Sequence, residues 1–143
     1  MGLFKFIRDA GKSLFGAGEA NAAEAIEKEV KDLGLDGDIK VEVDGEKVKI
    51  SGDVPNQETK EKIILAAGNV EGIAEVEDGM NAEAGGDEAN FHTVEKGDTL
   101  WAIATKAYGD GSKYPVIFEA NKPMLSDPDK IYPGQVLRIP ALS

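Results

Sequence analysis

The dipeptide Asp44-Gly45 constrains the fold most, because it joins two short segments that alternate between apolar and polar residues, 39–43 and 46–50. An Asp-Gly pair suits the positive φ angles of a two-residue hairpin turn. A period of two places alternate side chains on opposite faces of a sheet. The sequence therefore predicts an antiparallel hairpin with one buried face. That face would consist of Ile39, Val41, Val43, Val48 and Ile50.

Helical patterns flank this hairpin. Residues 21–33 and 56–67 have apolar side chains at helical spacing, and a glycine that is typical of helix ends, Gly34 or Gly68, follows each run. Residues 73–80 alternate again and predict a strand. The expected inward positions are Ile26, Val30 and Leu33, then Ile63, Ile64 and Ala67, then Ala74, Val76 and Met80.

The N-terminal residues 3–15 predict a short amphipathic helix, with Leu3, Ile7, Ala10 and Leu14 on one face. Such a helix would either pack on its own domain or lie on a membrane surface. Its polar face mixes both signs of charge, whereas a membrane-surface helix is usually cationic. We therefore expect it to pack on its own domain.

The order helix, hairpin, helix, strand between residues 21 and 80 resembles a BON domain. Two motifs carry the resemblance, Val41-x-Val43-Asp-Gly45-x-x-Val48-x-Ile50-x-Gly52 and Gly72-Ile73-x-x-Val76. BON domains are small interaction modules with an α-β-β-α-β order, so the resemblance implies an α+β fold.

The segment from residue 91 to residue 140 resembles a complete LysM domain, which implies a β-α-α-β order. We expect strands at 91–95 and 135–140, and a second helix at 114–121. The motif reads His92-Thr-Val-Glu-Lys-Gly97-Asp98-Thr99-Leu100-Trp101-x-Ile103-Ala104, Tyr108-Gly109, Ile117-x-x-Ala120-Asn121 and Ile131-Tyr132-Pro133-Gly134-Gln135-x-Leu137-x-Ile139-Pro140.

The first LysM helix should begin at a cap formed by Asp98 or Thr99. Its expected buried face consists of Leu100, Ile103, Ala104 and Ala107. Residues 81–90 lack apolar periodicity and predict a linker. The expected organisation is an N-terminal helix and BON-like domain at 1–80, a linker at 81–90 and a LysM domain at 91–143.

The net charge of −11 is unevenly distributed. Residues 91–143 carry six basic and six acidic side chains, so the negative charge belongs to residues 1–90. Such a field disfavours nucleic acid and anionic lipid and attracts cations, although an acidic surface also serves solubility alone. With no secretion signal and no apolar run that would span a membrane, a cytoplasmic monomer is expected.

No catalytic arrangement is visible. The chain has no cysteine and one histidine, His92, which lacks a recognisable catalytic partner and is expected to have no chemical role. Paired acids such as Asp127 and Asp129 lie among prolines in a predicted loop. We therefore expect a binding protein rather than an enzyme.

Leu65–Ile73 is the candidate ion-binding stretch. The last four carbonyls of a helix have no partner inside it, and they carry the negative end of the helix dipole. Residues 69–71 add further main-chain oxygens. Neutral backbone oxygens gathered together suit a large, weakly hydrated cation such as K⁺. The alternative is an ordinary left-handed helix cap whose carbonyls bind water.

The pairing of a BON with a LysM domain, the Met-Gly-Leu-Phe-x-Phe start and Glu119-Ala-Asn-Lys-Pro-Met124 together resemble the small cytoplasmic bacterial potassium-binding proteins. This resemblance covers the whole chain. It implies one K⁺ bound on the BON side and steadied by the LysM domain, in a potassium sensor or buffer. A further protein partner is left open. The implied main-chain ligands are Ile7, Ala10, Gly68, Val70 and Ile73.

The LysM resemblance carries an alternative function, a glycan-binding envelope module for N-acetylglucosamine polymers. The matching positions form two walls of a groove. They are Gly97, Asp98, Thr99 and Leu100 on one wall, and Lys130, Ile131, Tyr132 and Pro133 on the other.

Overall fold

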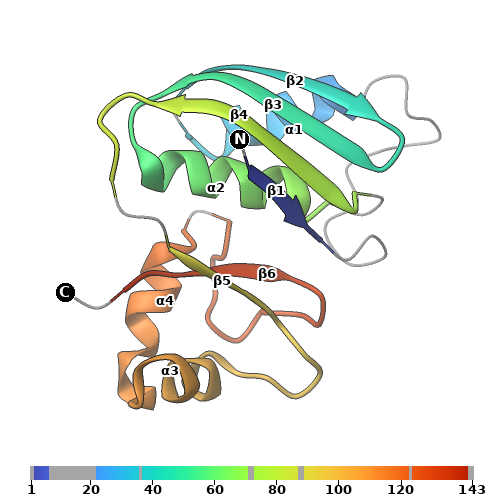
Figure 1. The fold of residues 1–143 in the computed structure, drawn as a ribbon. Helices are drawn as coiled ribbons and strands as arrows, with labels where there is room; N and C mark the ends of the chain where they lie inside the picture. Colours follow the sequence, from blue (N-terminus) through green and yellow to red (C-terminus); the bar gives the residue numbers. More distant parts are fainter. Residues whose placement is uncertain are drawn as a thin grey trace.

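The computed structural model describes residues 2–6, 22–35, 37–70, 73–86, 89–122 and 124–141. It confirms an α+β protein, in which one part with a four-stranded sheet packs on a second part with a two-stranded sheet (Figure 1). The elements of the first part are β1 (Gly2–Lys5), α1 (Ala22–Asp32), β2 (Asp38–Asp44), β3 (Lys47–Val54), α2 (Gln57–Gly68) and β4 (Glu75–Ala82). Those of the second are β5 (Asn90–Thr93), α3 (Leu100–Tyr108), the 3-10 turn η1 (Gly111–Lys113), α4 (Tyr114–Ala120) and β6 (Val136–Ile139).

The predicted hairpin is confirmed as β2 and β3, which pair antiparallel with Val41 opposite Ile50 and Val43 opposite Val48. Its turn lies one residue later than predicted, at Gly45 and Glu46, because Asp44 already pairs with Lys47 and only Gly45 has a positive φ. The sheet order is β1-β4-β3-β2, with β3 and β4 parallel and α2 connecting them. Apolar side chains of α1 and α2 join those of the sheet in one core. These helices cover one face of the sheet, as Figure 1 shows.

The predicted helix over residues 3–15 is wrong at its start. Residues 2–5 instead form β1, an edge strand that pairs antiparallel with β4 and places Phe4 opposite Val76. The free edge of β4 supplies main-chain partners that outweigh a weak local helical preference. This segment does pack on its own domain rather than on a membrane, as expected, because Phe6 lies buried in the core. Residues 7–15 lie outside the described residues.

Helix α2 lies at the centre of the molecule. The Asn56 side chain caps it by accepting a hydrogen bond from Thr59 N at 2.8 Å. Seven of its twelve residues are buried, because the sheet covers one side of the helix and β6 contacts another. A helix buried on several sides does not show the single apolar stripe of a surface helix. Ile63, Ile64 and Ala67 are buried as predicted.

The second part has the expected β-α-α-β order. Thr99, one of the two predicted caps, accepts a hydrogen bond from Ala102 N at 3.1 Å. Leu100, Ile103 and Ala104 are buried, but Ala107 is exposed, so its predicted burial is wrong. The helix ends one residue later, at Tyr108, with Gly109 in the left-handed conformation, and this end leaves Ala107 uncovered.

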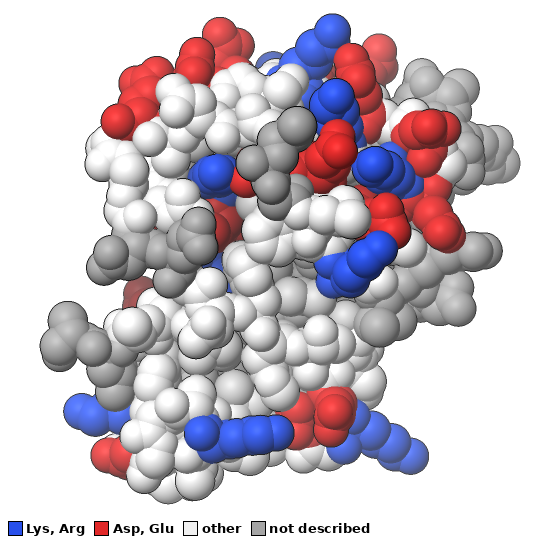
Figure 2. Space-filling view, viewed as in Figure 1, with Lys and Arg blue, Asp and Glu red and all other residues white. Residues whose placement is uncertain are grey.

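Charges of both signs gather over the outer face of the four-stranded sheet (Figure 2). Glu77 lies between Lys47 and Lys49, at 3.7 and 3.8 Å, and Lys5 pairs with Glu75 at the sheet edge. These pairs locally neutralise the acidic excess of residues 1–90. In the part of the chain that the structure describes, no helix has the length and apolar character needed to cross a membrane.

Candidate functional site: the connector from α2 to β4

The N-terminal segment meets the connector 68–74 at the C-terminal end of α2. A Cβ atom on Gly68 would lie 2.1 Å from Cζ of Phe6, so the ring tip sits where any other residue would carry a side chain. The Phe6 main-chain N donates to Ala74 O at 2.9 Å. The residue directly before Ile7 is therefore fixed against both ends of the segment 68–74.

Gly68 has a different role from the one predicted. It is the last residue of α2 and does not adopt a positive φ, and the cap position belongs to Asn69 with φ −81° and ψ 41°. The helix thus needs a glycine here for close approach of Phe6, not for a left-handed turn. The predicted left-handed cap at Gly68 is wrong, whereas Gly34, at φ 75°, is left-handed at the end of the first helix as expected.

The connector offers main-chain oxygens and buried side chains. Asn69 N donates to Leu65 O at 2.9 Å, so the last turn of α2 leaves Ala66, Ala67 and Gly68 as its terminal carbonyls. Val70 O accepts from Ile73 N at 3.1 Å, and a carbonyl oxygen retains a second lone pair.

Val70 and Ile73 are 1% and 0% exposed, so their apolar side chains anchor the backbone in the core and donate no ligand. The structure therefore brings Gly68, Val70 and Ile73 into one connector. Ile7, Ala10 and Gly72 lie outside the described residues. Among the described residues, no group of three His, Asp or Glu side chains is arranged to hold a metal ion.

Asn69 ties this connector to the second part of the molecule. Its Nδ2 donates to Val136 O at 2.8 Å, and its Oδ1 accepts from Val136 N at 2.9 Å. One side chain thus satisfies both main-chain groups of a residue in β6. The side chain of Val136 belongs to the core of the first part.

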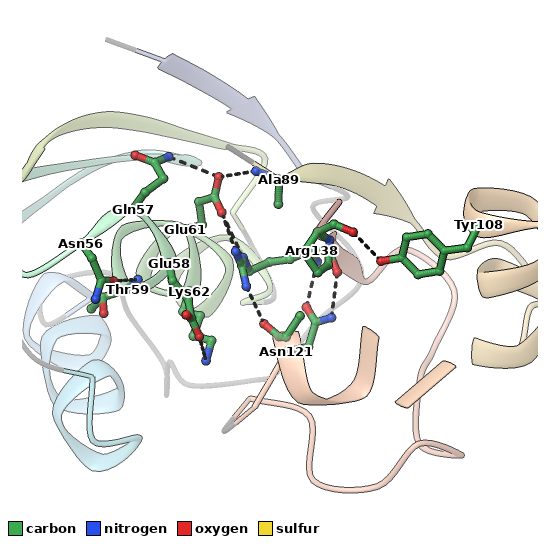
Figure 3. Close-up of polar contacts among 12 residues, drawn as sticks. Asn56, Gln57, Glu58, Thr59, Glu61, Lys62, Ala89, Tyr108, Asn121 and Arg138 are labelled. Atoms are coloured by element: carbon green, nitrogen blue, oxygen red, sulfur yellow. Dashed lines mark hydrogen bonds and ion pairs between the residues drawn. The ribbon is translucent and has the colours of Figure 1, made fainter. Parts of the chain in front are cut away.

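A buried ion pair joins the two parts beside this contact (Figure 3). Arg138 donates from Nη2 and Nε to Glu61 Oε1, at 2.9 and 3.0 Å, and from Nη1 to Ala120 O at 3.2 Å. Glu61 Oε2 accepts from Ala89 N at 2.9 Å and from Gln57 Nε2 at 3.2 Å. The side chains of Arg138 and Glu61 are 7% and 2% exposed. Each charge is therefore compensated by the other and by hydrogen bonds to fixed donors and acceptors.

Sequence reasoning missed Glu61 and Arg138. Arg138 carried a signal, because it interrupts the apolar run of β6 between Leu137 and Ile139. Glu61 carried none, because it stands between Lys60 and Lys62. All four residues of β6 are buried, which requires cover on both faces of the strand. Successive side chains of β6 point in opposite directions. Val136 and Arg138 contact the first part of the molecule, whereas Leu137 and Ile139 belong to the core of the second.

Comparisons with known proteins agree with both parts. The BON domain family matches residues 18–84, and the LysM domain family matches residues 92–140. The potassium binding protein Kbp of Escherichia coli is 44% identical over 147 residues, which covers 98% of this chain and 99% of that protein. This chain belongs to the Kbp family.

Other relatives of this Kbp-family chain match only in part. YqbP of Bacillus subtilis is 43% identical over 58 residues, which covers 34% of this chain and 26% of that protein. The esterase Rv1288 of Mycobacterium tuberculosis is 50% identical over 48 residues, which covers 34% of this chain and 10% of that protein. The shared part is a small portion of each of these larger proteins, so the esterase activity is not carried over to the Kbp-family chain.

The residues of the alternative glycan groove already have structural roles in this Kbp-family chain. Thr99 caps α3, and Leu100 is 3% exposed within the LysM core. Asp98 accepts from Glu95 N at 2.9 Å and lies 3.0 Å from His92 Nε2, and these contacts lower the pKa of the Asp98 carboxyl. His92 is half-buried and has a structural partner in Asp98.

The opposite wall of that groove faces the BON domain. Lys130 and Tyr132 line a pocket of about 200 Å³ together with Leu65, Ala66 and Asn69. Burial raises the pKa of the Tyr132 phenol, and Ile131 packs on the LysM core. Two of the predicted glycan-contacting residues thus line the boundary with α2 instead of an isolated LysM surface.

Proposed function

We propose that this chain binds K⁺ reversibly and selectively through main-chain oxygens of the α2–β4 connector and of the N-terminal segment. The proposed ligands are the carbonyls of Ile7, Ala10, Gly68, Val70 and Ile73. The observation that carries the proposal is the close approach of Phe6 to Gly68, together with its hydrogen bond to Ala74. It holds the chain that leads into Ile7 at the same helix end as the other three residues.

The chemistry of this connector suits K⁺. Its oxygens are neutral, and they lie at the helix end where the dipole is negative. Selectivity for K⁺ arises from the number, field and spacing of such oxygens, whereas carboxylate ligands favour Ca²⁺ or Mg²⁺. The Kbp relative is named for potassium binding, and it covers nearly the whole chain. The proposed role is that of a cytoplasmic potassium sensor or buffer, acting as a monomer without enzymatic activity.

The glycan-binding alternative has less support. The chain does contain a LysM domain, but Leu100 is buried and Thr99 is occupied as a helix cap. Lys130 and Tyr132 line the pocket shared with α2. Binding of chitin oligomers with changes confined to residues 97–100 and 130–133 would favour the alternative.

Insertion of two glycines between Phe6 and Ile7 tests the proposed ligand set. Residues 2–6 stay available for β1 and for the contact with Gly68, but Ile7 and Ala10 move out of register. We expect the K⁺ dissociation constant, measured by isothermal titration calorimetry, to rise at least about tenfold, which corresponds to about 1.4 kcal/mol.

The matched control carries the same two glycines between Gly16 and Ala17. Both proposed N-terminal ligands then keep their register with Phe6, so the K⁺ affinity should stay close to that of the unmodified chain. Equal losses in the two insertion variants, or no loss in the first, would exclude Ile7 and Ala10 as ligands.

A further inference from the structure

Two asparagine side chains close the outer edge of β6. The other edge of this strand pairs with β5, where Phe91 is opposite Arg138 and Thr93 is opposite Val136. Asn69 makes the paired hydrogen bonds to Val136 at 2.8 and 2.9 Å. Asn121 does the same to Arg138, donating to its O at 3.0 Å and accepting from its N at 2.8 Å. The two side chains thus replace a missing neighbouring strand.

The two asparagines differ in what they attach to the strand. Asn121 follows α4 and belongs to the same LysM domain as β6. Asn69 comes from the BON domain, where it caps α2 and stands between Gly68 and Val70. The peptide plane before Asn69 carries the Gly68 oxygen, and the plane after it carries the Asn69 oxygen and the Val70 nitrogen. The anchored Asn69 side chain therefore restricts rotation of the plane that holds the Gly68 oxygen, and it fixes where Val70 begins.

We propose that Asn69 is a positioning residue that sets the preference of the carbonyl site for K⁺ over Na⁺. The proposal rests on the proposed function, in which the Gly68 and Val70 oxygens bind the ion. A carbonyl site that relaxes freely contracts around the smaller Na⁺ and loses its preference. The two hydrogen bonds between the Asn69 side chain and Val136, one donated and one accepted, oppose that contraction, in addition to the helix hydrogen bond from Asn69 N to Leu65 O.

The test compares Asn69→Leu with Asn121→Leu. Each substitution removes a paired hydrogen bond to β6, but only the first lies in the connector. Dissociation constants for K⁺ and for Na⁺ are measured by calorimetry on the full chain. For Asn69→Leu we expect K⁺ to bind at least about tenfold more weakly, whereas the Na⁺ affinity should change less. The ratio of the Na⁺ to the K⁺ dissociation constant should therefore decrease. Asn121→Leu should lower stability but leave this ratio unchanged.

A ratio in Asn69→Leu equal to that of the unmodified chain overturns the positioning role, even if the variant is less stable. Unmodified protein that fails to bind K⁺ overturns the proposed function and the inference together, whereas K⁺ binding with an unchanged ratio in the variant overturns the inference alone. Should Asn69→Leu fail to fold, Asn69→Ser gives the same test, because the shorter side chain loses the planar donor–acceptor pair and remains polar at the helix end.

Discussion

Replacing Arg138 with methionine is expected to lower the free energy of unfolding by about 3–5 kcal/mol, because it leaves the Glu61 carboxylate buried without its cation. The Glu61 side chain is 2% exposed, and Arg138 supplies both hydrogen bonds to its Oε1. Ala120 O would lose its contact with the guanidinium as well. Urea denaturation followed by far-UV circular dichroism measures the loss.

The fluorescence of Trp101, the single tryptophan, adds a domain-specific signal because this residue lies in the LysM domain. In the unmodified chain we expect the fluorescence and circular dichroism transitions to coincide, because Val136 of the LysM domain packs in the core of the BON domain and a buried ion pair joins the two domains. In Arg138→Met they should separate. The double variant Glu61→Leu/Arg138→Met should recover part of the loss, because an apolar pair replaces an uncompensated charge. A single variant as stable as the unmodified chain would show that the pair does not hold the domains together.

Replacing Gly68 with alanine is expected to destabilise the protein by about 1–3 kcal/mol, although alanine normally favours a helix over glycine. The added Cβ would lie 2.1 Å from Cζ of the Phe6 ring, which is itself buried in the core. Phe6 must move, and with it the chain leading to Ile7. If the proposed ligand set is correct, the K⁺ affinity should fall together with the thermal stability.

Gly79→Ala is the matched control for this substitution. An added Cβ at Gly79 would lie 3.3 Å from Ile50 O, a much longer distance than the one at Gly68. Gly79 is exposed and lies on β4, away from the connector. We expect a smaller loss of stability and an unchanged K⁺ affinity. Adding Phe6→Leu to Gly68→Ala should restore part of the stability, because a smaller side chain leaves room for the methyl group. If Gly68→Ala is as stable as the unmodified chain and binds K⁺ equally well, the close packing of Phe6 on Gly68 is not required.

Local patterns in the sequence were sufficient for most of the secondary structure. The alternation on either side of Asp44-Gly45 predicted the hairpin and its buried face, because a period of two is a property of the segment itself. The position of the turn was one residue too early, since Asp44 pairs with Lys47. The prediction for the N-terminal segment was wrong because its structure depends on contacts with a distant strand. Its spacing of apolar residues is compatible with a helix, but the open edge of β4 supplies tertiary hydrogen bonds that favour the strand β1.

The contacts between the two domains were not predictable in this way. Glu61 and Arg138 are 77 residues apart, and no local period links them. The pairing of Asn69 with Val136 depends on two domains meeting at a particular register. The pattern indicated Gly68 as a helix end, but a glycine is needed there because the tip of the Phe6 ring occupies the place of a side chain. Phe6 lies 62 residues earlier in the chain, so no local pattern reveals this contact. A site made of main-chain oxygens leaves no residue-type signature, so the sequence indicates its ligands only through the family resemblance.

The most direct test of K⁺ binding at the α2–β4 connector is a pair of ¹⁵N-HSQC titrations, one with KCl and one with NaCl at matched ionic strength. We expect K⁺ to shift the amide signals around Gly68, Val70 and Ile73, with much smaller changes in NaCl and little change around residues 97–100. Amide signals of the connector that stay in place with KCl, or that move equally with the two salts, would contradict selective K⁺ binding at this site.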